Sequence, residues 1–174
     1  SFTAALKDLK EIWEIPYSDK ADPIYKGLVH DYRYKEGIAE TGAFPVRVIA
    51  VEDFLDDFFF DRGYDNLVGT SRDGKSAQVV NLHVKRGIER VALPGMPHLG
   101  SGITWDWKGS TVMATPNLKD GIVTVIDTRS WAVVKNIATL GPGFFMRSHE
   151  NTPYAWADSM MSPASKDTLT LIDK

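Results

Sequence analysis

The sequence predicts an all-β fold and, within that class, a piece of a β-propeller. The first observation is a repeat, because Val79-Val80-Asn81, Val125-Ile126-Asp127 and Leu171-Ile172-Asp173 follow one another at intervals of 46 residues. The second is that short alternating apolar and polar runs are separated by turn signals such as Lys108-Gly109. Repeats of roughly 40 to 50 residues built from short strands are typical of propeller blades.

Length and composition narrow the function classes. The chain has 174 residues, of which 43% are hydrophobic and 25% charged, which is enough apolar material for a core. We expect no membrane span, since no run approaches the ~18 apolar residues required, and no export leader is visible at the start. The net charge is -3 and the chain has one small basic cluster, Lys85-Arg86 near Arg90, which argues against nucleic acid as a binding partner. Absence of cysteine excludes disulfides and c-type haem attachment within this stretch.

The clearest repeat begins at Met96 and contains four expected strands: Gly102–Trp105, Thr111–Thr115, Ile122–Asp127 and Trp131–Ile137. Lys-Gly and Asp-Gly pairs in its turns supply the positive φ angles that hairpins require. The preceding repeat places strands at Leu67–Thr70, Ala77–Leu82 and Gly87–Leu93, and the following one at Phe144–Met146, Tyr154–Asp158 and Leu169–Asp173. Four antiparallel strands therefore make one blade.

The repeat also sets the expected domain organisation. Trp13-Glu14-Ile15 matches Val80-Asn81-Leu82, but the interval exceeds the period by 21 residues, which indicates an insertion. We expect one partial propeller domain over residues 1–174, with blades near 1–16, 46–93, 94–139 and 140–174 and an insertion at 17–45. About three and a half blades are fewer than the roughly 4 to 8 of a closed propeller, so we expect a longer protein. The insertion, which holds His30, is either functional or a solvated loop.

Three segments carry the candidate chemistry. The first strands of propeller blades line a central axis, and the residues that lead into them are Leu55-Asp56-Asp57, Pro97-His98-Leu99 and Phe144-Phe145-Met146; we call these the lead-in segments. Asp56, His98 and Phe145 are expected to face a common cavity. The imidazole can transfer a proton or bind a metal, the carboxylate can take a proton or orient the imidazole, and the phenyl ring offers a flat apolar face.

Each of these residues also has a purely structural interpretation. The Pro-His pair and the two aspartates occur as turn and capping residues, and Gly100 serves either a tight turn or the close approach of a ligand. Arg147 either pairs with a ligand carboxylate or is solvated, and His149 and His83 are expected in turns. The tryptophans are expected to pack between blades. We find no Ser-His-Asp spacing, phosphate-binding glycine loop or His-x-x-x-His metal pair, and we expect no metal site made by this chain's own side chains.

Longer strings carry a family resemblance. The sequence resembles the haem d1 propeller domain of the cytochrome cd1 nitrite reductase family. The strings that carry the resemblance are Leu93–Gly102, Ala114–Asn117, Leu140–His149, Phe54–Asp61, and Trp13–Ile15 with Gly27–Arg33. The resemblance spans essentially the whole chain. It implies an eight-bladed propeller in the periplasm that holds haem d1 over its axis, beside an upstream cytochrome c domain with haem c.

The resemblance also implies roles for particular residues. His98 matches one of two distal histidines, Phe145 an aromatic residue that lines the macrocycle, and Gly100 and Arg147 lie in the same matching strings. Asp56 stands where the second distal histidine is expected, and Ser101 where a basic residue is expected. A carboxylate at this place disfavours the nitrite anion by ~1 kcal/mol or more, whereas it suits proton removal.

Within the family the chain is similar to the dihydro-haem d1 dehydrogenases. Such an enzyme turns a propionate side chain of dihydro-haem d1 into an acrylate, losing two electrons and two protons, in the last step of haem d1 synthesis for denitrification. The resemblance implies haem d1 or its dihydro precursor as ligand, a cytochrome c electron partner and a nitrite reductase as recipient of the cofactor. His98 and Asp56 are the candidates for the base or its orienter. The alternatives are reduction of nitrite to nitric oxide, a non-enzymatic haem d1 carrier and a generic binding propeller.

Overall fold

The protein is described by a computed structural model that covers residues 1–20, 46–71 and 75–174, and these residues form four antiparallel sheets. The first sheet contains β1 (Phe2–Leu6), β2 (Glu11–Ile15) and β3 (Arg47–Ala50). The second contains β4 (Asp57–Phe60), β5 (Asn66–Thr70), β6 (Ser76–Asn81) and β7 (Arg86–Ala92). The third contains β8 (Ile103–Trp107), β9 (Ser110–Pro116), β10 (Ile122–Asp127) and β11 (Val133–Ala138). The fourth contains β12 (Met146–Ser148), β13 (Tyr154–Asp158) and β14 (Leu169–Asp173).

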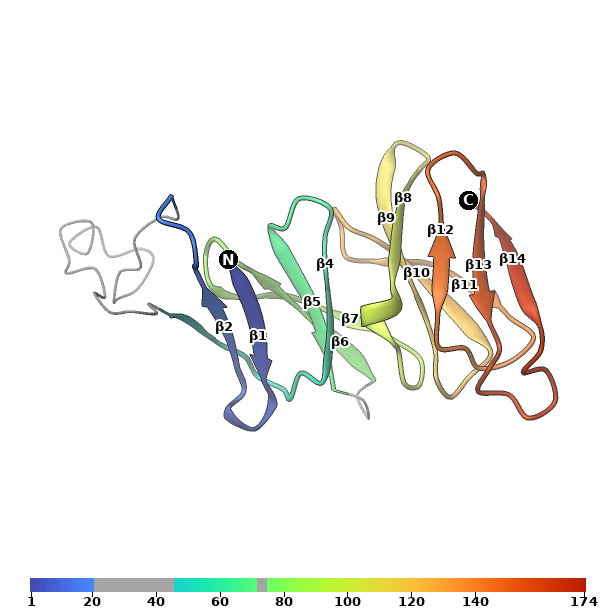
Figure 1. The fold of residues 1–174 in the computed structure, drawn as a ribbon, viewed down its shortest axis with the longest axis horizontal. Coiled ribbons are helices and arrows are strands. Elements are labelled where there is room, and N and C mark those ends of the chain that lie inside the picture. The colour runs from blue at the N-terminus through green and yellow to red at the C-terminus, as the bar shows by residue number, and fades with distance from the viewer. Residues whose placement is uncertain (21–45, 72–74) are drawn as a thin grey trace.

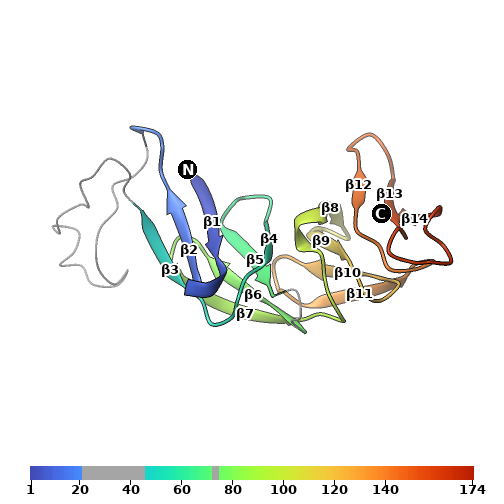
Figure 2. The ribbon, with the colours of Figure 1, turned by 60° about the horizontal axis from the view of Figure 1, so that its bottom comes forward.

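The sheets lie side by side in chain order, from β1–β3 at one end to β12–β14 at the other (Figures 1 and 2). An apolar cluster fills each space between consecutive sheets. The cluster between the first and second sheets includes Ile12, Ile49, Leu67 and Val80. The next includes Val68, Val79, Leu99 and Met113, and the last Val112, Val125, Met146 and Ala155. Meander sheets stacked face to face in this way are blades of a propeller, so the expected fold class is confirmed.

Asn81 and Asp127 end the third strands of the second and third sheets, and both are repeated for a local reason. Asn81 Oδ1 accepts hydrogen bonds from the backbone N–H groups of His83 and Val84, both at 3.0 Å. Asp127 Oδ1 accepts from those of Arg129 and Ser130, at 2.9 and 2.8 Å. Short polar side chains that bond to the backbone in this way stabilise turns. The 46-residue repeat is therefore a repeat of the hairpin turn after β6 and β10.

The structure corrects several of the expected boundaries. The strand expected at Phe144–Met146 is observed as β12, Met146–Ser148, so Phe144 and Phe145 lie in the loop before it. β3 pairs with β2 in the first sheet, so the first blade continues past the insertion and the expected boundary at residue 46 is wrong by one strand. β11 begins at Val133 and not at Trp131, because Trp131 has a left-handed φ of 57° and belongs to the hairpin turn. Most of the insertion, including His30, lies outside the described residues.

Two short 3-10 helices complete the described part of the chain. They are η1 (Lys7–Leu9), between β1 and β2, and η3 (Leu99–Ser101), immediately before β8. Neither they nor any other helix in the described ranges is long and apolar enough to cross a lipid bilayer.

Candidate functional site

The three lead-in segments lie at the starts of β4, β8 and β12, which are the first strands of their sheets and lie at the sheet edges. Asp57 and Met146 are the first residues of β4 and β12, and Leu99 begins η3, which comes before β8. Contacts join neighbouring segments across the sheets. The Asp57 carboxylate accepts hydrogen bonds from the Gly100 N–H, at 2.9 and 3.1 Å for its two oxygens. The ring of His98 in turn bonds to the backbone of Phe144. The second, third and fourth sheets are thus linked in series at the candidate site.

His98 is held in one orientation by its neighbours. Its Nδ1 lies 2.7 Å from the carbonyl oxygen of Phe144. Because a carbonyl oxygen only accepts, Nδ1 carries the proton and donates it. In the neutral ring the lone pair is then on Nε2, which is the atom that can take a proton or bind a metal. The backbone N–H of His98 donates to the oxygen of Pro116 at 2.9 Å, which fixes the loop as well as the ring.

Aromatic and cationic groups lie beside the imidazole. The ring centroids of His98 and Phe144 are 4.1 Å apart, and those of His98 and Phe145 6.4 Å apart. Phe145 is 44% exposed. The Arg147 guanidinium lies 5.7 Å from the Phe145 ring centroid, within the range of a cation–π contact. We call His98, Phe144, Phe145 and Arg147 the His98 patch; three of them were candidate residues from the sequence.

The structure explains why residue 100 is a glycine, and the explanation could not be read from the sequence. A Cβ at this position would lie 2.6 Å from Oδ1 of Asp57, so the carboxylate that the Gly100 N–H binds leaves no room for a side chain. The close approach that glycine permits here is to a carboxylate of its own chain. Its expected contact with a ligand stays a prediction.

Asp56 makes a different contact from the one expected. Its Oδ1 lies 2.8 Å from Nζ of Lys7 in η1, and its side chain is 16% exposed. The link to the His98 loop is made by the next residue, Asp57, which is the first residue of β4. The ion pair also offsets the negative charge of Asp56. The electrostatic argument against an anionic ligand is therefore weaker than the sequence alone indicated.

Sequence reasoning missed Asp158, at the end of β13. Its Oδ1 accepts from the N–H of Phe144 at 2.6 Å and its Oδ2 from the N–H of Phe145 at 3.1 Å. The carboxylate therefore holds the backbone that carries the acceptor of His98. An aspartate after the alternating strand Tyr154–Ala157 was the available signal, since a polar residue at a strand end commonly binds neighbouring backbone.

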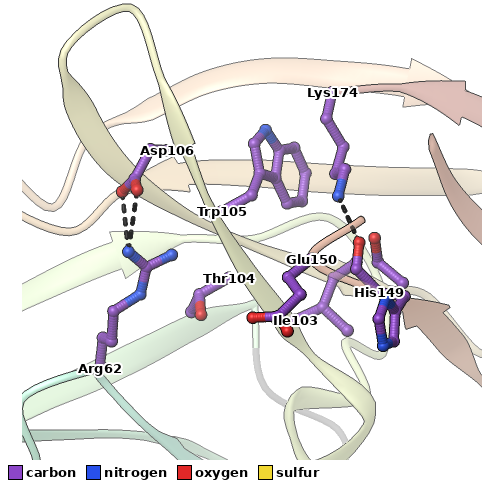
Figure 3. A pocket seen from close by; sticks show the side chains of 9 residues that line it. Arg62, Ile103, Thr104, Trp105, Asp106, His149, Glu150 and Lys174 are labelled. Atoms are coloured by element: carbon purple, nitrogen blue, oxygen red, sulfur yellow. Dashed lines mark hydrogen bonds and ion pairs between the residues drawn. The ribbon is translucent and has the colours of Figure 1, made fainter. Parts of the chain in front are cut away.

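One pocket, of about 530 Å³, lies between β8 and the turn from β12 to β13 (Figure 3). The Arg62 guanidinium binds both oxygens of Asp106 across it, at 2.9 and 3.0 Å, and lowers the pKa of that carboxyl. Lys174 Nζ donates to the carbonyl oxygen of His149, which lies in a turn as expected. Trp105 lines this pocket and packs between the third and fourth sheets, as expected. None of the His98 patch lines it.

A second pocket, of about 400 Å³, lies between the first and second sheets. It is lined by Glu14 and Arg47, which form an ion pair at 3.0 Å, and by Phe58, Phe60 and Tyr64 among others. This pocket also contains none of the candidate residues.

The His98 patch fits a flat conjugated ring with acidic side chains. An exposed phenyl face can stack on the ring, a guanidinium can pair with a carboxylate, and Nε2 of His98 can face a reacting hydrogen. Within the described ranges no group of three or more His, Cys, Asp and Glu side chains is placed to hold a metal ion.

Comparison with known proteins places the chain in a family. Residues 1–174 match the cytochrome D1 heme domain family. The dihydro-heme d1 dehydrogenase of Pseudomonas aeruginosa is 41% identical over all 174 residues, which span 31% of that protein. The solved structure of the dihydro-heme d1 dehydrogenase NirN in complex with DHE superposes with a TM-score of 0.81 over the whole chain and 33% of the NirN chain. The chain thus spans about a third of the length of these relatives.

A more distant structure shows the fold alone. Hydrazine synthase from Kuenenia stuttgartiensis is 15% identical and has a TM-score of 0.55 over 80% of this chain and 38% of its own. The blade arrangement therefore also occurs in a protein with little sequence identity to this chain.

Proposed function

Because the chain belongs to the cytochrome D1 heme domain family over its whole length, we propose that it forms part of a periplasmic oxidoreductase that converts dihydro-haem d1 to haem d1. The observation that carries the proposal is the hydrogen bond of the His98 ring. Its Nδ1–H is committed to Phe144, so Nε2 is available as a base beside an exposed aromatic face. The name of the 41% identical relative, dihydro-heme d1 dehydrogenase, supports the same reaction.

The reaction asks for a base and an electron acceptor. Two C–H bonds of a propionate side chain break and one carbon–carbon double bond forms, so two protons and two electrons leave the substrate. We assign Nε2 of His98 as acceptor of one proton, Phe145 as the stacking surface and Arg147 as the partner of a substrate carboxylate. The electrons pass to haem c, on an upstream domain or a separate cytochrome c, and a nitrite reductase receives the product.

Asp56 is the second candidate for proton transfer. Its ion pair with Lys7 places a charged acceptor and a charged donor next to each other at the loop that leads into β4. We propose that Asp56 takes up or relays the second proton, while Asp57 keeps the His98 loop in place.

The test uses the full-length protein with dihydro-haem d1 and an oxidised cytochrome c, followed by the absorption spectrum of the tetrapyrrole. His98→Gln is expected to slow oxidation by about 10²- to 10⁴-fold, the usual contribution of a positioned base, with tetrapyrrole binding retained. Asp56→Asn is expected to slow the reaction more than it weakens binding. Equal rates in wild type and His98→Gln would overturn the role of His98. Binding without turnover, with any cytochrome c, would instead indicate a carrier.

Nitrite reduction remains the second candidate because Lys7 offsets the charge of Asp56. The same protein, loaded with haem d1 and given nitrite and a reduced cytochrome c, is expected to release no nitric oxide. Release at a rate similar to dihydro-haem d1 oxidation would contradict the dehydrogenase assignment.

A further inference from the structure

The acceptor of the His98 proton is part of a longer chain of hydrogen bonds. The carbonyl oxygen of Phe144 and the N–H of Phe145 belong to the same peptide group. The first accepts from His98 Nδ1 at 2.7 Å, and the second donates to Oδ2 of Asp158 at 3.1 Å. An imidazole on the third sheet and a carboxylate on the fourth are thus joined through one peptide group.

This peptide group is held from both sides. Asp158 also binds the N–H of Phe144, at 2.6 Å, so one carboxylate fixes two successive amides. A Cβ on Gly143 would overlap the carbonyl oxygen of Asp158, so the approach of the loop to β13 requires glycine. On the other side the Gly143 N–H donates to Asn117, and the His98 N–H to Pro116, at 3.0 and 2.9 Å. Donor and acceptor of the His98 hydrogen bond are therefore anchored to adjacent residues at the end of β9.

We propose that Asp158 is a positioning residue that holds the Phe144 carbonyl toward His98 and thereby keeps the proton on Nδ1 and the lone pair on Nε2. The Asp158 carboxylate polarises the intervening peptide group, which makes its carbonyl oxygen a better acceptor. Without the carboxylate two backbone donors lose their partner, the loop relaxes and Nδ1–H loses its acceptor. The imidazole then also populates the alternative tautomer, in which Nε2 is protonated and is no longer a base.

The link to catalysis rests on the proposed function, whereas the link to the tautomer does not. The side-chain hydrogen bonds of Asp158 in the described structure all come from backbone N–H groups, those of Phe144, Phe145 and Met160. Its effect on the reaction therefore passes through His98 and the Phe145 ring. Its replacement is therefore expected to lower kcat for dihydro-haem d1 oxidation without a comparable change in KM.

The primary test reads the tautomer directly. Full-length protein with ¹⁵N-labelled histidine and reduced haem c is studied by NMR, and the His98 signals are identified by their absence in His98→Gln. Wild type is expected to show protonated Nδ1 and unprotonated Nε2. Asp158→Ala is expected to show a mixture of tautomers and at least a tenfold lower kcat, and Asp158→Asn, which keeps one oxygen acceptor, an intermediate result. Asp127→Asn, whose carboxylate also binds two backbone amides but in another turn, is the matched control and is expected to leave the His98 signals unchanged.

The outcomes separate the two proposals. Wild-type His98 signals in both Asp158 variants would overturn the positioning role, whatever the activity. Altered signals in a protein that never oxidises dihydro-haem d1 would support the positioning role and overturn the proposed function. Should Asp158→Ala fail to fold, Asp158→Asn alone decides, because unchanged tautomer and kcat in that variant contradict the proposal.

Discussion

At the scale of single residues, short acidic side chains organise this protein mainly by binding backbone amides. Asp57 and Asp158 bind the loops around His98, and Asp127 binds its own hairpin turn. For Asp127 the hydrogen bond from Ser110 and those from the turn lower the carboxyl pKa from 3.8 to about 2. The carboxylate of Asp127 therefore accepts hydrogen bonds from its turn in the same way as the side-chain amide oxygen of Asn81 does in the preceding repeat.

Asp127 gives the residue-scale prediction. Asp127→Ala is expected to lower the thermal midpoint by about 2–4 °C, the shift for loss of roughly 1 kcal/mol in a domain of this size. Asp127→Asn should recover most of this loss at pH 7. Because the folded pKa is depressed, the charge-dependent stabilisation is present above about pH 4 and is lost as the pH falls through about 2.

Unfolding of the full-length protein followed by circular dichroism at pH 7, 4 and 2 checks these expectations. The difference between wild type and Asp127→Asn should shrink toward pH 2. A difference that grows on acidification would contradict the assigned cause of the pKa shift.

At the scale of elements, two-residue hairpins and left-handed residues set where strands begin and end. Lys108 and Gly109, between β8 and β9, have φ angles of 49° and 81°. Both positive values are typical of a type I′ turn, which matches the twist of the flanking strands. Lys85 and Trp131 also adopt left-handed φ angles, each after a third strand, although neither residue type favours them.

The turn at Lys108 supports an element-scale prediction. Lys108→Asn creates the Asn-Gly pair preferred in this turn and is expected to leave stability equal or higher, despite loss of the contact between Lys108 Nζ and the Trp107 ring. Lys108→Val is expected to be less stable by about 1 kcal/mol, because a β-branched residue fits poorly at positive φ. Urea unfolding of the two variants, side by side, measures the difference. Equal stability would exclude a type I′ turn as the constraint on this hairpin.

The strands were more predictable than the boundaries between blades. β10, β13 and β14 coincide with the predicted ranges, because alternation and turn residues are local signals. β3 was placed in the wrong blade because it follows an insertion, and β11 was started too early because a left-handed Trp131 carries no sequence signature. The site shows the same contrast. His98 and Phe145 could be brought together by counting along the repeat. The choice between Asp56 and Asp57, and the part played by Asp158, depend on side-chain direction and backbone partners.

At the scale of the whole molecule, apolar surfaces hold the sheets together and exposed ion pairs contribute little. Leu99 and Met113 are fully buried between the second and third sheets. The bridge from Arg62 to Asp106 joins the same two sheets, but its side chains are 51% and 70% exposed. Exposed ion pairs are screened and entropically opposed, whereas a buried methionine loses its packing when truncated.

A pair of variants at this interface tests the contrast. Met113→Ala is expected to destabilise the folded protein by about 2–5 kcal/mol. Asp106→Asn is expected to leave the unfolding midpoint unchanged. Both are measured by urea unfolding of the full-length protein at low and moderate salt. A larger effect of Asp106→Asn than of Met113→Ala would mean that charge, and not apolar packing, joins these sheets.

The candidate site forms late in folding, because its contacts join residues that are far apart in the sequence. Asp57 and Gly100 are 43 residues apart, and His98 and Phe144 are 46 residues apart. Contacts between residues so far apart in the sequence form after the local hairpins, because bringing the ends of a long loop together costs conformational entropy. During synthesis the imidazole emerges a full blade ahead of its acceptor. The orientation of the His98 ring is therefore fixed late, and no single blade cut from this protein would hold it.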